Sequence, residues 1–150
     1  MGDVCEIPAF DTTSDEIKSI LTTSKTIAIV GLSQKDERPS NKVARYLLDR
    51  GYIIVPVCPK YDEILGLKSY PSLSVISEDI DIVDIFRKPD VISEIVESTI
   101  RKGVNVIWMQ EGIVNNEAAE KAKNAGLEVV MNKCMMKEHK KWCVIKPIRR

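Results

Sequence analysis

Short apolar runs alternate along the chain with longer stretches in which apolar residues recur every three or four positions. This alternation is typical of β-α-β units built around a parallel sheet. The apolar runs predict strands at residues 26–30, 52–57, 80–86, 104–109 and 127–131, with a short extra strand at 68–70. The periodic stretches predict helices at 40–50, 91–102 and 116–124, an opening helix that Thr13 or Ser14 starts, and a partly helical tail after residue 132. We therefore expect an α/β fold: a Rossmann-like open, mostly parallel sheet with helices on both faces.

Pro56 and the lack of linkers add information on the position of one strand and on the number of domains. Pro56 lacks an amide donor, so the strand that contains it is expected at an edge of the sheet or near the strand's own end. The chain shows no internal repeat, low-complexity tract or linker. Residues 1–150 are therefore expected to form one domain, with 1–13 and 143–150 as less ordered ends.

Composition narrows the classes of function. The 22 basic and 22 acidic side chains cancel, so the overall charge draws the protein neither to nucleic acid nor to a membrane surface. No apolar run approaches the roughly 20 residues of a membrane-spanning helix. The N-terminus is acidic and lacks the order of a signal peptide. We expect a cytoplasmic protein that acts on a small molecule and has no membrane partner.

The four cysteines include no Cys-x-x-Cys pair. Only Cys134, His139 and Cys143 lie close enough in sequence to be weighed as metal ligands. Their spacing matches no common zinc pattern, and a fourth ligand is missing. We expect no metal site, and thiols that stay reduced.

The loops after the strands are the expected binding region, because ligands of open parallel sheets bind beyond the carboxyl ends of the strands. In the first loop, Gly31 allows a sharp turn and the close approach of an anion. Ser33, Arg38 and Ser40 surround the start of the next helix, where free amides and the helix dipole suit a pyrophosphate. The alternative is an ordinary glycine turn with a surface arginine. The loop matches neither the Gly-x-Gly-x-x-Gly fingerprint nor the phosphate-binding P-loop.

The second loop carries Lys60 where a NAD-binding fold usually places an acid. A cation there suits the 3′-phosphate of coenzyme A or the 2′-phosphate of NADP, although an exposed loop lysine is the simpler interpretation. Arg87, after the next strand, can pair with phosphate or support an adenine ring. In the fourth loop, Gln110 and the amide of Gly112 suit an amide-rich or thiol-bearing ligand arm.

Eight short motifs, in this order, resemble the stand-alone coenzyme A-binding proteins related to the N-terminal domain of the succinyl-CoA synthetase α subunit. They are Val30-Gly31-Leu32-Ser33, Arg38-Pro39-Ser40, Gly51-Tyr52, Pro56-Val57-Cys58-Pro59, Gly66-x-Lys68-x-Tyr70-Pro71-Ser72-Leu73, Asp84-Ile85-Phe86-Arg87, Trp108-x-Gln110-x-Gly112-Ile113 and Cys134-Met135. The likeness covers nearly the whole chain and implies a Rossmann-like fold that holds coenzyme A. It implies that the pyrophosphate contacts lie at Gly31, Ser33, Arg38 and Ser40, the 3′-phosphate region at Lys60, and the rest of the groove at Leu32, Pro59, Phe86, Arg87, Gln110 and Gly112.

Two features depart from that family. Cys58 stands where the family commonly has asparagine, so a hydrogen-bonding side chain is lost near the nucleotide, or a thiol is placed there instead. The single histidine, His139, lies in a basic tail without an obvious acid partner, which argues against full synthetase activity.

Three functions remain open. The first is a module that binds coenzyme A or an acyl form of it, and the absence of a clear base beside a nucleophile favours this over an enzyme. The second is an enzyme that uses NADP or acyl-CoA, with Asp62, Glu63 or Glu111 as its base. The third is a nucleic-acid or protein interaction domain that uses residues 133–150, which contain seven Lys or Arg and one acid. A solvated surface is the commoner role of such a run. Exposed sheet edges also allow a homodimer.

Overall fold

The structure is a computed structural model that describes residues 8, 9 and 11–142. Residues 1–7, 10 and 143–150 lie outside the described part, and so do Cys5, Cys143 and most of the two expected less ordered ends.

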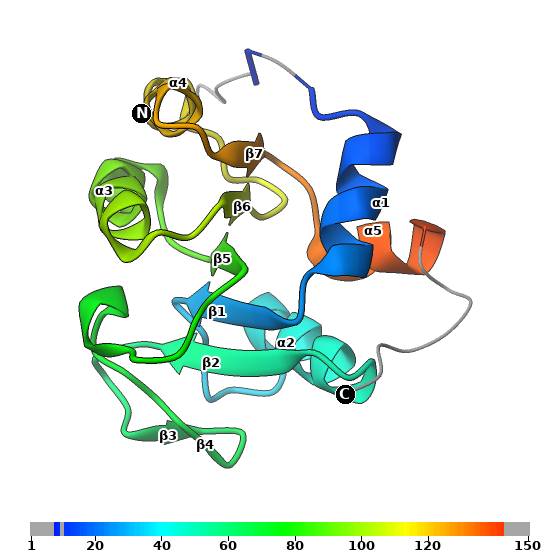
Figure 1. The fold of residues 1–150 in the computed structure, drawn as a ribbon. Helices are drawn as coiled ribbons and strands as arrows, with labels where there is room; N and C mark the ends of the chain where they lie inside the picture. The colour runs from blue at the N-terminus through cyan, green and yellow to red at the C-terminus, as the bar shows by residue number, and fades with distance from the viewer. Residues whose placement is uncertain (1–7, 10, 143–150) are drawn as a thin grey trace.

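Five parallel strands form the central sheet in the order β2-β1-β5-β6-β7 (Figure 1). The strands are β1 Thr26–Val30, β2 Ile53–Val57, β5 Ile82–Ile85, β6 Val106–Met109 and β7 Glu128–Val130. The sequence-based expectation of a Rossmann-like, mostly parallel sheet is confirmed. The strand that contains Pro56 is indeed at an edge, where the missing amide donor removes no hydrogen bond to a further strand.

Helices cover both faces of the sheet, as expected (Figure 1). They are α1 Ser14–Thr23, α2 Pro39–Asp49, α3 Ile92–Lys102, α4 Asn116–Asn124 and α5 Met135–Trp142, with 3₁₀ turns at η1 Leu73–Val75 and η2 Pro89–Val91. One apolar cluster joins α3 and α4 to the sheet, and a second joins α1, α2 and α5 to the opposite face. Both faces of the parallel strands are therefore buried, which explains why the strands are nearly continuous apolar runs.

Thr13 is the residue that starts the opening helix. Its hydroxyl accepts a hydrogen bond from the Glu16 amide at 3.2 Å, and the Glu16 carboxylate accepts one from the Thr13 amide at 2.9 Å. This reciprocal pair is a capping box, which satisfies amides that would otherwise lack a partner.

The expected strand at 68–70 was only partly correct. Strand β4, Leu67–Lys68, pairs antiparallel with β3, Glu63–Ile64, in a separate two-stranded hairpin. Tyr70 alone reaches the main sheet, through an isolated bridge to Val57. The sequence missed β3 because a strand of two residues is too short to show a period of alternation.

Candidate functional site

A cleft of about 580 Å³ opens at the carboxyl edge of the sheet, where the loops after β1, β2 and β5 meet. Its walls consist of Gly31, Leu32, Ser33, Lys35, Arg38, Pro39, Ser40, Val57, Cys58, Pro59, Lys60, Tyr61, Phe86 and Arg87. Nine of the eleven residues proposed from the sequence lie here. The two that do not are Gln110 and Gly112. Lys35 and Tyr61 also line the cleft but were not expected there, because a loop pattern does not reveal which side chains face inward.

Gly31 lines the cleft and allows the loop after β1 to lie close to the loop after β5. Its φ is +90°, and a β-carbon built on it would lie 2.5 Å from the carbonyl oxygen of Phe86 and 2.8 Å from Cδ of Arg87. The Gly31 amide donates to the carbonyl of Val57 at 2.9 Å, and the Phe86 amide donates to that of Val30 at 2.9 Å. The sharp turn expected at Gly31 is present. The close approach that requires glycine, however, is made by the chain's own Phe86–Arg87 segment.

The loop from Ser33 to Ser40 forms the second wall and leads into α2. The Ser40 hydroxyl accepts a hydrogen bond from the Ser33 amide at 3.0 Å, and the Ser33 hydroxyl accepts one from the Lys35 amide at 3.1 Å. Asn41 donates from its side chain to the Ser33 carbonyl at 2.8 Å. A hydroxyl that accepts one bond still has a proton to donate. Both serines, at the positive end of the α2 dipole, can therefore bond an anion.

The third wall is the segment after β2, and the residues that follow the hairpin form hydrogen bonds with it. The Cys58 amide donates to the Tyr70 carbonyl at 2.8 Å, and the Ser69 hydroxyl donates to the Cys58 carbonyl at 3.1 Å. The Gln34 side chain donates to the Glu63 carbonyl at 2.8 Å, which ties the first loop to the hairpin. The motif around Tyr70 therefore positions the wall that carries Cys58 and Lys60.

Four cations line the cleft, Lys35, Arg38, Lys60 and Arg87, and no carboxylate does. None of the four forms a salt bridge with a described residue. Opposing carboxylates would neutralise this charge, and their absence from the walls leaves the potential positive. The cleft is therefore suited to a ligand with several negative charges.

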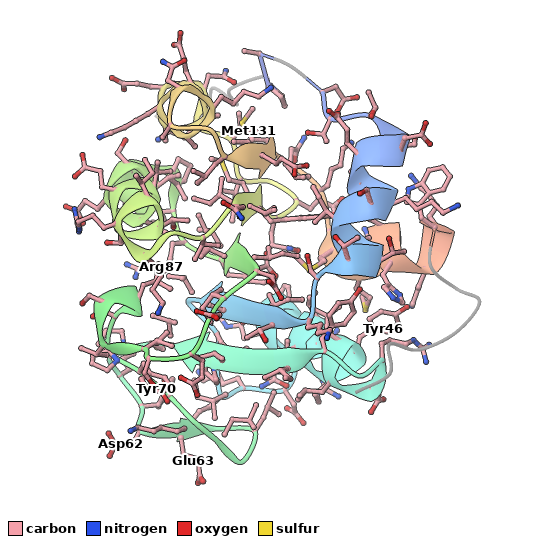
Figure 2. All side chains as sticks on the ribbon, viewed as in Figure 1. Tyr46, Asp62, Glu63, Tyr70, Arg87 and Met131 are labelled. Atoms are coloured by element: carbon pink, nitrogen blue, oxygen red, sulfur yellow. The ribbon has the colours of Figure 1, made fainter. Side chains whose placement is uncertain are left out.

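The three carboxylates considered as bases lie elsewhere. Asp62 and Glu63 stand at the β3–β4 hairpin, whereas Arg87 lies next to α3 (Figure 2). Glu111 is paired with Lys137 at 2.9 Å. None of the three lines the cleft.

Gln110 and Gly112 are engaged by other parts of the protein. Gln110 is 2% exposed, and its side-chain amide donates to Oδ1 of Asp84 at 2.5 Å. Its oxygen accepts from the Met135 amide at 3.3 Å. The Gly112 amide donates to Oδ1 of Asn132 at 2.7 Å. The polar atoms expected to face a ligand arm are bonded inside the fold.

Asp84 is the residue whose role the sequence did not reveal. It is fully buried in β5, and Oδ2 has no hydrogen-bond partner among the described residues. Burial raises the pKa of Asp84 to about 8, against the opposing effects of the hydrogen bond from Gln110 and of the Ile85 backbone. The sequence did contain a signal, an acid inside an apolar run. A buried polar group normally has a hydrogen-bond partner, so such an acid predicts a second polar residue nearby.

A second cavity of about 230 Å³ adjoins the cleft and shares Val57, Pro59 and Arg87 with it. Its other walls are Val30, Pro71, Ser72, Leu73, Glu94, Ile95 and Ser98. The cavity combines apolar side chains with the polar side chains of Ser72, Arg87, Glu94 and Ser98. This combination is typical of a pocket for a flat organic group.

No group of three potential metal ligands occurs within residues 8, 9 and 11–142. Cys143, one of the three residues weighed as ligands, lies outside that range. His139 is buried, and its Nδ1 lies 2.8 Å from the hydroxyl of Tyr46. Burial lowers the pKa of His139, with a smaller contribution from Arg50. Within the same range, no helix has the length and apolar character to cross a membrane.

The chain is similar in sequence to known proteins. The chain is 42% identical to an uncharacterized protein of Bacillus subtilis over 83% of its own length and 92% of that protein. It is 29% identical to an ADP-forming acetate–CoA ligase of Methanocaldococcus jannaschii, over 74% of this chain but 17% of the ligase. The chain thus matches only a small part of the ligase.

Solved structures of other proteins share this fold. A hypothetical protein from Pyrococcus horikoshii OT3 superposes with a TM-score of 0.87 at 47% identity, covering 92% of this chain and 97% of that one. A dinucleotide-forming acetyl-coenzyme A synthetase of Ca. Korarchaeum cryptofilum has a TM-score of 0.64 at 25% identity, over 73% of this chain and 26% of the synthetase. The family model described as the CoA binding domain matches residues 25–140. With this match over most of its length, the chain belongs to the CoA-binding domain family.

Proposed function

We propose that this chain binds coenzyme A, or an acyl form of it, in the cleft between the loops after β1, β2 and β5, and serves as a binding module. The observation that carries the proposal is the set of four cations on the cleft walls, none of which has a salt bridge to a described residue, in a cleft that no described carboxylate lines. Coenzyme A carries a pyrophosphate and a 3′-phosphate, so its negative charges match this surface. The family to which the chain belongs supports the same ligand.

The pyrophosphate is assigned to the start of α2. There Ser33 and Ser40 each keep a hydroxyl proton to donate, and Arg38 adds a guanidinium. Helix N-termini are ready-made phosphate sites because their first amides are free and the dipole is positive. Lys60, on the opposite wall, is assigned to the 3′-phosphate.

The adenine ring is assigned to the second cavity, which shares Pro59 and Arg87 with the cleft. A guanidinium plane can stack on a base as well as pair with a phosphate. Leu32 and Phe86 supply apolar wall, as expected from the sequence. Gln110 and Gly112 lie outside the proposed contact set, because Asp84, Met135 and Asn132 already occupy their polar groups.

The interaction-domain alternative has less support from the described part of the basic tail. Lys133 pairs with Asp11 at 3.3 Å, Lys137 with Glu111, and Lys141 with Glu138 at 3.5 Å. Cations that are already paired contribute little to phosphate binding.

Isothermal titration with coenzyme A, 3′-dephospho-coenzyme A, NAD and NADP tests the proposal. Lys60→Ala is expected to weaken coenzyme A binding about tenfold, since a charge-assisted bond to phosphate is lost. It should leave binding of the dephospho form unchanged. Arg38→Ala should weaken both, because both carry the pyrophosphate. Lys18→Ala is the matched control: this exposed lysine lies on α1 and does not line the cleft.

Three results would contradict the assignment. Equal losses for both coenzyme A forms in Lys60→Ala would remove the 3′-phosphate from Lys60. Heat from NADP but not from coenzyme A would favour an oxidoreductase. No heat from any of the four ligands would overturn the binding function itself.

A further inference from the structure

A buried polar chain runs through the face of the sheet opposite α3 and α4, away from the proposed coenzyme A contacts. It begins at Asp84 in the middle of the sheet and passes through Gln110, whose amide donates to Oδ1 of Asp84 at 2.5 Å. It ends at Met135, the first residue of α5, whose amide donates to the Gln110 oxygen at 3.3 Å. Gln110 therefore connects one carboxyl group to the start of one helix.

The segment that leads into α5 makes further bonds to the same edge. The Trp108 indole donates to the carbonyl of Lys133 at 2.8 Å, and the Lys133 amide donates to the carbonyl of Met109 at 3.3 Å. Asn132, whose φ is +61°, accepts from the Gly112 amide at 2.7 Å. A short run of polar contacts, with Gln110 at its buried end, therefore joins the start of α5 to the sheet, beside the apolar packing of Met135.

Asp84 has no described cation to balance a negative charge. The neighbouring strands β1 and β6 contain no charged residue, and the buried residues of α1 are apolar. On α5, Lys137 pairs with Glu111 and Glu138 accepts from the Trp142 indole. His139 faces Tyr46. The charged state of Asp84 would therefore be a buried anion held only by the Gln110 amide and the Ile85 backbone, which an apolar interior strongly disfavours.

We propose that Asp84, Gln110 and the first turn of α5 form a proton-controlled latch, closed while the Asp84 carboxyl is neutral and opened when it ionises. An ionised carboxylate gains most by admitting water, and the orphaned Oδ2 is where water would bond. Because Oδ2 is buried, water can reach it only if the packing around this carboxyl loosens, and Gln110 joins the same carboxyl to the start of α5.

The pH range follows from burial, which raises the pKa of Asp84 to about 8. The folded protein therefore holds a proton that the unfolded chain has already released. The stability of the closed latch is fully present below the ordinary pKa of an aspartate, falls as the pH rises towards the raised pKa, and is constant above it. Opening is therefore expected to increase up to about pH 8, with α3 and α4 unaffected because they lie on the other face.

Hydrogen exchange of the full chain, followed by NMR from pH 6 to 9.5, tests the latch. Protection factors corrected for intrinsic rates are compared between α5 and α3. The α5 amides should lose protection by about tenfold per pH unit up to about pH 8 and no further above it, while the α3 amides keep theirs. Asp84→Asn should keep α5 protected throughout, because its side chain cannot ionise. Glu111→Gln, which removes only the surface pair with Lys137, should retain the pH response.

A second measurement does not depend on any variant folding. The carboxyl carbon shift of Asp84 in the unaltered protein should titrate at the pH where the loss of α5 protection levels off. A midpoint in the ordinary aspartate range would overturn the proposal. Constant α5 protection across the series, or a pH response that persists in Asp84→Asn, would do the same.

Discussion

Adding a single methyl group at Gly31 should damage both stability and ligand binding. In Gly31→Ala the new carbon would lie 2.5 Å from the carbonyl oxygen of Phe86 and 2.8 Å from Cδ of Arg87. The backbone φ of +90° also disfavours alanine. The left-handed conformation costs about 1–2 kcal/mol, and forcing an extra carbon into a packed site costs about 1–3 kcal/mol. The expected total is therefore about 2–5 kcal/mol, a large share of a typical domain's 5–15 kcal/mol.

Gly103→Ala is the matched control. Its φ is +85°, close to that of Gly31, but a β-carbon there meets nothing within 4 Å. Gly103→Ala should therefore show only the conformational cost, and the difference between the two variants isolates the collision with Phe86. Urea unfolding followed by far-UV circular dichroism measures both free energies of unfolding.

The same collision predicts a change in binding. Relief of the contact requires the Phe86–Arg87 segment to move away from Gly31, and that segment forms one wall of the cleft. Coenzyme A affinity should fall in Gly31→Ala under conditions where the variant remains folded, and stay unchanged in Gly103→Ala. Equal losses of stability in the two variants would refute the close approach as the reason for glycine at this position.

Two further substitutions test smaller features. Thr13→Ala removes the acceptor for the Glu16 amide and should lower the free energy of unfolding by about 1 kcal/mol, measured by denaturation. An unchanged value would mean that the capping box contributes nothing. Cys58→Asn places an amide side chain on the cleft wall and should tighten coenzyme A binding about threefold or more by adding a hydrogen bond. Unaltered or weaker affinity in titration would show that position 58 does not contact the ligand.

The alternation of apolar runs and helical periods was enough to predict the fold, because strands that are buried on both faces of a sheet are apolar along nearly their whole length. Local chemistry also limited Pro56 to a sheet edge or a strand end, and the start of the first helix to Thr13 or Ser14, and the structure has the edge and Thr13. Most of the cleft could be named from the sequence for a general reason. Parallel strands bring their carboxyl ends to one edge, so residues that directly follow β1, β2 and β5 must meet there.

The tertiary structure decided which polar groups bond to one another inside the fold and are therefore withdrawn from the cleft. Asp84 lies beside Trp108 in the strand register, and this brings it within reach of Gln110, which in turn bonds the start of α5. The bridge between Val57 and Tyr70 likewise depends on how a hairpin folds back. Periodicity reports burial along one element at a time. The partner of a buried polar atom is set by the register of separate strands and by the docking of a distant helix, which no local pattern encodes.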